Sequence, residues 1–327
     1  MPVRTELILA MQITYLAYGL QLRCSVALAG LTPKVATDGL PSIAISLVTP
    51  RELDTTWSGS DGPVEWRGQL GDGRSLTIER GLEGDLLFTY SDRARFRLDH
   101  TKLALDCAPS EEGPRWQQVL LGRILPNVAL ERGYEALHAG AVASPEGVIA
   151  VAAPSGTGKT TLATELMRRG WPLFTDDVLV LAADDDGVLA YPGPPLMNVA
   201  ADQAGDGACD AFGQTLAVLS GERWVTTAHA SDGDCPVRMV CLFERAEGLP
   251  LGLQRIPSSP LPLAPYMLGL AGGRERERER FSLYSDLMDS AELVRLTCGV
   301  GDRPGDLADL LEDAVGSPTV LAARGSS

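Results

Sequence analysis

The chain has 327 residues, of which 45% are hydrophobic, enough to bury a substantial core and to form two domains. Its 28 basic and 43 acidic side chains give a formal net charge of −15, which argues against nucleic-acid or anionic-membrane partners. No apolar run approaches the ~20 residues of a membrane span. The apolar patch from Leu7 to Met11 lacks a cleavage site, and the six cysteines lack metal-ligand spacing. We therefore expect a cytoplasmic protein with reduced thiols and no signal peptide.

Residues 1–115 alternate short apolar runs with turn residues, a pattern typical of antiparallel β structure. The strands that this pattern predicts are Ser25–Leu28, Ile43–Val48, Leu76–Glu79, Asp85–Tyr90, Ala94–Asp99 and Lys102–Cys107. The polar stretch from Thr49 to Pro63 is expected to be an exposed loop. No catalytic constellation is visible here, and His100 is assigned no function. We predict a smaller β-rich N-terminal domain.

A helix is predicted from Trp116 to Arg132, where apolar residues recur at helical spacing. Pro126 should kink or divide this helix. We interpret residues 116–133 as a connection to a C-terminal domain at 134–327. The small-residue segment from Leu137 to Ala143 is then predicted to form one strand, which carries His138.

The strongest motif begins with an apolar strand, Val148 to Ala153, and continues as a tight loop and a helix that ends near Arg169. Backbone N–H groups of a glycine-rich loop converge on phosphate oxygens, and the helix directs its positive end at the same anion. Lys159 is expected to reach the β- and γ-phosphates, and the Thr160 hydroxyl to ligate Mg²⁺. The strict pattern starts with Gly where this chain has Ala153. The predicted nucleotide-binding residues are Pro154, Ser155, Gly156, Thr157, Gly158, Lys159, Thr160 and Thr161.

A second apolar run, Pro172 to Thr175, ends in the acidic pair Asp176-Asp177. Val178–Ala183 and Val188–Tyr191 are predicted to form a hairpin. Residues 200–235 are rich in Ala, Gly and Asp without a clear pattern, and no element is predicted there. Another strand is predicted from Val237 to Phe243.

Charged residues near the C-terminus leave several interpretations open. Arg238 and Arg245 lie at the two ends of the Val237–Phe243 strand, from which either could approach phosphates. The alternating Arg/Glu run at 274–280 is either a solvated or mobile surface segment or an arginine comb for an acidic peptide or a phosphate. Other elements predicted here are a helix at Leu261–Leu270, a strand at Leu293–Thr297 and a closing helix at Asp306–Val315.

His138, Lys159 and the Asp176-Asp177 pair follow one another at spacings that resemble the catalytic core of the HPr kinase/phosphorylase family. The resemblance is close over about residues 137–181. It implies an α/β fold, with an HPr-kinase-like P-loop domain behind the smaller β-rich domain. Tyr18-Gly19-Leu20 and Leu28-Ala29-Gly30-Leu31 resemble shorter HPr-kinase-related proteins, some of which phosphorylate the C-terminal serine of a lasso-peptide precursor.

The resemblance implies an ATP- and Mg²⁺-dependent kinase that acts on a Ser or Thr hydroxyl of a peptide or small protein. Asp177 would be the catalytic base, Asp176 would hold Mg²⁺, and His138 would either orient the base or touch the γ-phosphate. Two alternatives are a small-molecule kinase or carboxykinase-like enzyme and a nucleotide-binding regulator without transfer activity. A homo-oligomer is one of the assembly states that we consider.

Overall fold

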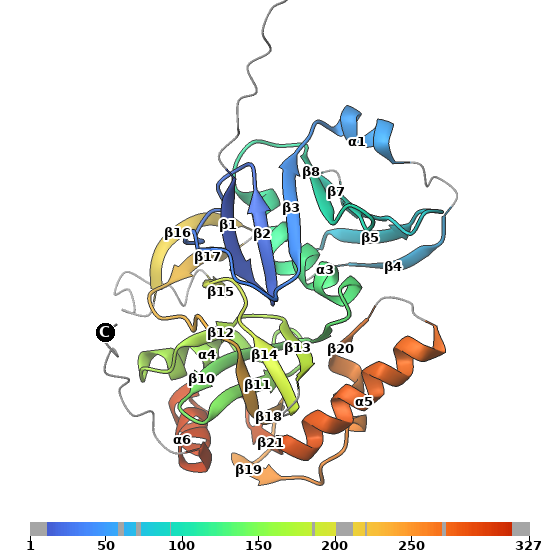
Figure 1. Ribbon diagram of the computed structural model, residues 1–327. Helices are drawn as coiled ribbons and strands as arrows, with labels where there is room; N and C mark the ends of the chain where they lie inside the picture. Colours follow the sequence, from blue (N-terminus) through green and yellow to red (C-terminus); the bar gives the residue numbers. More distant parts are fainter. Residues whose placement is uncertain are drawn as a thin grey trace, which may run out of the picture.

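The computed structural model describes residues 12–57, 62–69, 73–91, 93–184, 187–200, 212–219, 221–269 and 273–315. The chain forms a mixed α/β structure with two large sheets, drawn one above the other in Figure 1. A helical segment passes between the sheets. The Leu7–Met11 patch, part of the 200–235 segment and part of the Thr49–Pro63 stretch lie outside the described residues. No helix in the described part of the chain is long and apolar enough to cross a membrane.

The first sheet contains eight strands in the order β1-β2-β3-β8-β7-β6-β5-β4. Their bounds are Ile13–Ala17 (β1), Leu20–Cys24 (β2), Ser42–Leu47 (β3), Val64–Gln69 (β4), Ser75–Arg80 (β5), Leu86–Tyr90 (β6), Ala94–Asp99 (β7) and Ala104–Pro109 (β8). The strands from β8 through β4 pair antiparallel as predicted, but β3 pairs parallel with both β2 and β8. The parallel pairs join segments that are distant in the chain, which local patterning does not reveal.

Two local predictions for this region were wrong. Ser25–Leu28 is not a strand, because β2 ends at Cys24 and the chain turns so that the Leu28 N–H donates to the Tyr15 hydroxyl at 3.2 Å. The Thr49–Pro63 stretch contains a helix, α1 (Pro50–Thr56). Thr49 and Glu52 form a reciprocal capping box at its start, in which each side chain accepts a hydrogen bond from the backbone N–H of the other residue.

The predicted connecting helix is divided into three parts: α2 (Arg115–Val119), the π-helical turn η1 (Leu120–Ile124) and α3 (Leu125–Glu131). Pro126 stands in the first turn of α3, where its missing N–H is tolerated, so the division predicted for this residue is confirmed. The buried residues of all three parts join one core cluster with the first sheet and with residues such as Val178 and Val180 of the second half. The predicted domain division at 115/116 and 133/134 stays a prediction.

The second sheet has the order β12-β10-β11-β18-β14-β13-β9-β20, with β21 beside β18 and β19 beside β21. The bounds are Glu135–Leu137 (β9), Ala139–Ser144 (β10), Gly147–Ala152 (β11), Leu173–Thr175 (β12), Leu179–Asp184 (β13), Gly187–Tyr191 (β14), Cys235–Arg245 (β18), Gly252–Arg255 (β19), Met267–Leu268 (β20) and Glu292–Cys298 (β21). A smaller sheet has the order β15-β17-β16, with bounds Leu196–Ala200, Glu222–Thr227 and Phe212–Leu219. The β13/β14 hairpin and the strand around Val237–Phe243 are confirmed.

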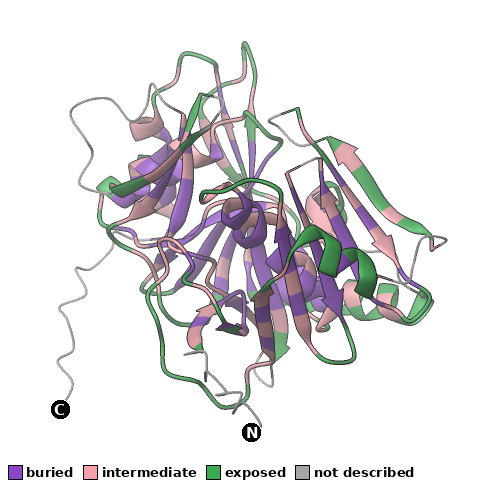
Figure 2. Cartoon of the chain, turned by 90° about the horizontal axis from the view of Figure 1, so that it is seen from above, coloured by how far each residue is buried: buried purple, intermediate pink, exposed green. Residues whose placement is uncertain are grey.

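Helices cover both faces of the second sheet. Ile149 and Val151 of β11 pack in one cluster with α4 (Lys159–Arg168) and α6 (Pro304–Val315), which confirms the closing helix. Ala150 and its neighbours on the other face pack with α5 (Arg274–Ser290). Because successive strand residues point to opposite faces, β11 is apolar along its whole length. Figure 2 shows the resulting buried interior as purple strands, with green at the rims.

Three further predictions in this half need correction. Residues 200–235 contain β16 and β17, where register shifts in β16 and two neighbouring buried residues in β17, Trp224 and Val225, interrupt the alternation that identifies a strand. The predicted helix at Leu261–Leu270 is a 3₁₀ turn, η2 (Leu261–Tyr266), followed by β20, because prolines inside it interrupt helical hydrogen bonding. The Leu137–Ala143 strand is split at His138 into β9 and β10, which pair with different neighbours.

The Arg/Glu run at 274–280 lies on the surface and is exposed except at the half-buried Arg276 and Arg280, which agrees with the prediction of a solvated surface segment, whereas the arginine comb stays a prediction. The run forms the first turns of α5. Arg276 and Arg280 form ion pairs with the buried carboxylate of Glu135, at 2.6 and 2.9 Å, and thereby attach α5 to β9. Burial raises the pKa of Glu135, and the two guanidinium groups oppose that rise.

Candidate active site

The predicted phosphate loop joins the end of β11 to the start of α4. Gly156 and Gly158 adopt left-handed backbone angles, with φ of 81° and 111°, which other residues adopt only at a cost. The Thr157 hydroxyl donates to the Pro154 carbonyl at 2.8 Å and closes the loop on itself. Ala153 is fully buried and has no positive φ, so this position of the chain does not need the glycine of the strict pattern.

Lys159 is the first residue of α4, and its side chain lies inside the loop. The ammonium donates to the carbonyl of Ala153 at 2.7 Å and to that of Pro154 at 3.4 Å. It also lies 3.3 Å from Nε2 of His138. The side chain is therefore held by the loop and by β9–β10 at once.

The Asp176-Asp177 pair occupies a bend between β12 and β13, as the sequence led us to expect of two neighbouring carboxylates that serve one site. The Thr175 hydroxyl donates to the Val178 carbonyl at 2.7 Å across this bend. Asp176 accepts a hydrogen bond from the Thr160 hydroxyl at 3.2 Å and one from the Asn198 backbone N–H at 2.9 Å. The two groups predicted to hold Mg²⁺ are thus in direct contact.

Asp177 turns to a different set of partners. Its Oδ1 lies 3.4 Å from Nδ1 of His138, and its Oδ2 forms a 2.7 Å ion pair with Arg123 of η1. His138, Asp177 and Arg123 keep 24%, 31% and 38% of their side-chain surface exposed, so a bound molecule can reach all three. A continuous row of contacts runs from Lys159 through His138 and Asp177 to Arg123.

The protonation states follow from burial and from this row. Desolvation lowers the pKa of His138, against the opposing pull of Asp177, so the imidazole is neutral near pH 7. A neutral ring with Nδ1–H directed at Asp177 leaves Nε2 as the acceptor for the Lys159 ammonium. Desolvation also lowers the pKa of Lys159. Desolvation, with a contribution from Asp177, raises the pKa of Asp176 to about 7.

The acidic bend is packed against small residues and one tyrosine. A methyl group at Gly140 would lie 2.7 Å from the Asp176 carbonyl oxygen, so β10 can approach the bend only with glycine at this position. A methyl group at Gly193 would lie 2.5 Å from the Thr175 hydroxyl. Tyr18, buried beside Gly193, donates its N–H to the Pro192 carbonyl at 2.8 Å. Burial raises the pKa of its hydroxyl, and Asp177 adds to the rise.

The remaining residues singled out from the sequence belong to the phosphate loop and to the two ends of β18. Thr161 is in the first turn of α4, and Pro154, Ser155 and Gly156 are exposed at the tip of the loop. Arg245 ends β18 on the same side as the loop, with its guanidinium 3.3 Å from where a Gly158 Cβ would stand. Arg238 lies at the opposite end of β18, where it pairs with Glu146 and Glu292, and so does not belong to the site.

Sequence reasoning missed two side chains of this region. Arg123 reaches Asp177 from a helix that was interpreted only as a connection. Gln118 of α2 donates to the Asn198 side chain, whose backbone in turn binds Asp176. The one available signal was that Arg123 interrupts an apolar stretch in which Leu120, Leu121, Ile124 and Leu125 are all buried.

The donor set fits Mg²⁺ and a nucleotide. The Thr160 hydroxyl and the Asp176 carboxylate are hard oxygen ligands, and Mg²⁺ in phosphoryl-transfer sites takes one or two such groups together with phosphate oxygens. In the part of the chain that the structure describes, no group of three or more His, Cys, Asp and Glu side chains forms a metal site.

Comparisons with known proteins add little. No family model matches the chain, and no curated protein matches it. Among solved structures, the chain is similar to an HPr(Ser) kinase/phosphatase from Coxiella burnetii. The match has 10% sequence identity and a TM-score of 0.32, and covers 55% of this chain and 95% of that one. A likeness at this level carries no argument about activity, which must come from the site.

Proposed function

We propose that this protein is an ATP- and Mg²⁺-dependent kinase that transfers the γ-phosphate to a Ser or Thr hydroxyl of a peptide or small protein. The observation that supports the proposal is the separation of two neighbouring carboxylates. Asp176 contacts the threonine of the phosphate loop, whereas Asp177 contacts a neutral histidine and an arginine. A nucleotide-binding regulator needs the first arrangement but has no use for the second.

The proposed roles follow from the physics of phosphoryl transfer. In the transition state the transferred phosphoryl group is only weakly bonded to the attacking and leaving oxygens, and its own oxygens carry negative charge. Catalysis therefore depends on positioning and on nearby positive charge. The loop amides and Lys159 would bind the phosphates, and Thr160 and Asp176 would hold Mg²⁺. The ion held there would supply positive charge beside the phosphates.

Asp177 would accept the proton of the attacking hydroxyl. The Nδ1–H of His138 would fix one of its oxygens, and Arg123 the other. Of the two roles considered for His138, this arrangement favours orientation of the base over contact with the γ-phosphate. His138 also contacts Lys159, so one side chain would position both the base and the lysine that binds the phosphates.

Within this class, the acceptor to test first is the precursor peptide of a lasso-peptide pathway, because the N-terminal motifs of the chain resemble kinases of that kind. The test is incubation of the protein with γ-labelled ATP, Mg²⁺ and precursor peptides that carry a terminal serine. Label on serine supports the proposal. Release of labelled phosphate alone, or label on small molecules alone, would indicate one of the other enzyme classes. Binding of ATP without any turnover would indicate a regulator.

A further inference from the structure

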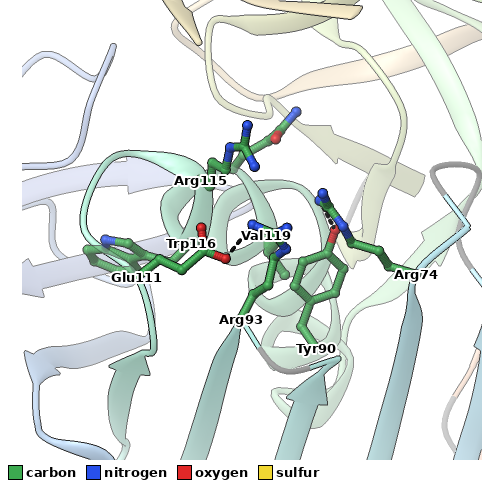
Figure 3. Close-up of a pocket in the computed structure, with 8 residues that line it drawn as sticks. Arg74, Tyr90, Arg93, Glu111, Arg115, Trp116 and Val119 are labelled. Atoms are coloured by element: carbon green, nitrogen blue, oxygen red, sulfur yellow. Dashed lines mark hydrogen bonds and ion pairs between the residues drawn. The ribbon is translucent and has the colours of Figure 1, made fainter. Parts of the chain in front are cut away.

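A recess beside α2 has room for about one water molecule, which is too little for a substrate or a cofactor. Figure 3 shows it at one end of the first sheet, with these residues in its lining: Arg74, Tyr90, Arg93, Trp116 and Val119. The first sheet contacts the surroundings of the acidic bend at another place, the turn that joins β1 to β2. This turn consists of Tyr18 and Gly19.

Tyr18 is held in an uncommon backbone conformation. Ala17 pairs with Leu20, so Tyr18 and Gly19 form a two-residue hairpin turn, and their φ angles are 57° and 70°. Such turns favour Asn, Asp or Gly because both positions need a positive φ. A bulky residue adopts this angle at a cost and persists where its surroundings hold it there. The contacts of Tyr18 must therefore offset that cost.

The turn is fixed against the second half of the chain. A methyl group at Gly19 would lie 2.9 Å from the rings of both Tyr134 and Tyr191, so the turn can enter between them only with glycine at this position. The Tyr134 hydroxyl donates to the Gly19 carbonyl at 3.3 Å. On the other side of the turn, the Tyr18 N–H donates to the Pro192 carbonyl at 2.8 Å. These contacts direct the Tyr18 side chain into the interior.

The Tyr18 side chain meets Thr175, the residue directly before the acidic bend. A methyl group at Gly193 would lie 2.5 Å from the Thr175 hydroxyl and 3.1 Å from the Tyr18 ring, and both side chains are buried. The Thr175 hydroxyl gives its one proton to the Val178 carbonyl at 2.7 Å. Towards the Tyr18 hydroxyl, with which it shares a hydrogen bond, it can therefore only be the acceptor.

This relay of two hydroxyl groups closes the acidic bend. Thr175 and Val178 stand directly on either side of the aspartate pair, and Val178 belongs to the same buried cluster as Tyr18. Burial raises the pKa of the Tyr18 hydroxyl, and Asp177 adds to the rise, so the group stays protonated and serves as a donor near pH 7. A shift of either flanking residue would change how Asp177 faces His138.

We infer that Tyr18 is a positioning residue, which fixes the acidic bend through Thr175 and so sets the direction of Asp177. This inference rests on the proposed kinase function for the role of Asp177 and adds to it a contribution from the first sheet. The phosphate loop and Lys159 take their contacts from other groups. Loss of the Tyr18 hydroxyl should therefore lower the rate of transfer and leave nucleotide affinity unchanged.

Tyr18→Phe is the main test, because it removes the hydroxyl and keeps the ring. With labelled ATP and a peptide that carries a terminal serine, kcat should fall by about threefold to tenfold, as for one neutral hydrogen bond. Calorimetric affinity for a non-hydrolysable ATP analogue with Mg²⁺ should stay at the wild-type value. Tyr134→Phe is the matched control, because it removes a hydroxyl from the other side of the same turn and should leave kcat near wild type.

A double-mutant cycle tests the path of the effect. Thr175→Val removes the middle of the relay with little change in side-chain volume. If Tyr18 acts through Thr175, the double variant Tyr18→Phe/Thr175→Val should be no slower than Thr175→Val alone. Rate losses that multiply would show that the Tyr18 hydroxyl acts independently of Thr175, and would overturn the inference.

An NMR measurement reads the position of the base without any transfer. His138 is one of three histidines in the chain, so its imidazole signal can be assigned with His138→Gln. Its Nδ1 lies 3.4 Å from Oδ1 of Asp177, so the signal responds to the position of that carboxylate. In protein without ATP, Tyr18→Phe should shift the His138 signal, whereas Tyr134→Phe should not.

The outcomes separate this inference from the kinase proposal. If wild type phosphorylates no peptide and Tyr18→Phe still shifts the His138 signal, the kinase proposal fails and the positioning role stands. If Tyr18→Phe equals wild type in both kcat and the His138 signal, the tyrosine is a structural part of the turn and the inference is wrong. Equal effects of Tyr134→Phe would assign the change to the turn as a whole, and would likewise overturn it.

Discussion

The two ends of the candidate site are held in different ways. At the phosphate-loop end, Lys159 and Thr160 are fixed by groups that lie within about 25 residues of them in the second sheet. At the other end, Asp177 is held by Arg123, from a helix that packs against the first sheet. The first end takes its contacts from the second half of the chain, whereas the second end also takes one from a helix that belongs to the core of the first sheet. We therefore expect nucleotide binding and phosphoryl transfer to respond separately to substitution.

The largest effect is expected from Lys159→Ala, at the phosphate-loop end. Transfer should be abolished, since a positioned positive charge on the phosphates is lost. The protein should stay folded, because the ammonium serves the loop rather than the apolar core. Initial rates with labelled ATP test this, beside thermal unfolding of the same sample. Lys34→Ala, an exposed surface lysine, is the matched control. Wild-type turnover in Lys159→Ala would disprove the phosphate-loop assignment.

The next effect separates the two aspartates. Asp177→Asn should lower transfer by about 10²–10⁴-fold and leave Mg·ATP binding unchanged, because a base acts only in the reaction step. Asp176→Asn should weaken metal-dependent binding as well, because its carboxylate contacts the Thr160 hydroxyl. Calorimetry with a non-hydrolysable ATP analogue, with and without Mg²⁺, and single-turnover transfer distinguish the two. Exchanged results would exchange the roles, and unaffected transfer in both variants would make the bend purely structural.

Arg123→Gln probes the end that depends on the first sheet. Loss of its ion pair should free one oxygen of Asp177 and lower transfer by about 10–10²-fold, while affinity for Mg·ATP stays near wild type. Arg123→Lys should retain part of the activity, because it keeps the charge but not the planar fork. Arg255→Gln, at a guanidinium that is 74% exposed, serves as control. An equal loss of nucleotide affinity in Arg123→Gln would show that the two ends are not separable.

The smallest effect concerns pH. The pKa of Asp176 is raised from 3.8 to about 7, so its carboxylate must lose a proton to hold Mg²⁺. Mg²⁺-dependent nucleotide affinity should therefore fall by up to about tenfold per pH unit below pH 7. Titrations between pH 5.5 and about 8 test this. Affinity that does not change with pH would contradict the raised pKa.

The same shift has a consequence for stability. The folded state binds this proton more tightly than the unfolded state, so the stabilisation is present below about pH 4 and is lost as pH rises through about 7. Asp176→Asn removes the titrating group. The free energy of unfolding of this variant, measured relative to wild type, should therefore be about 2 kcal/mol higher at pH 8 than at pH 5. Denaturant unfolding at the two pH values measures the difference. A larger gain at pH 5 would reverse the sign and disprove the assignment.

The elements around the phosphate loop could be predicted because their signals are local. The apolar run before the loop, the two glycines with positive φ and the helix start at Lys159 are adjacent in the chain. Backbone geometry in such a unit depends on residue type at each position, with little input from the rest of the fold. The contact of Thr160 with Asp176 follows from the same short segment.

The remainder of the site depends on contacts between distant parts of the chain. Arg123 meets Asp177 across 54 positions only because the helical segment packs between the two sheets and its π turn sets the direction of the side chain. The split at His138 arises because β9 and β10 pair with different strands. The amino-acid sequence thus determines the phosphate loop through local backbone geometry, whereas long-range packing decides what faces the acceptor.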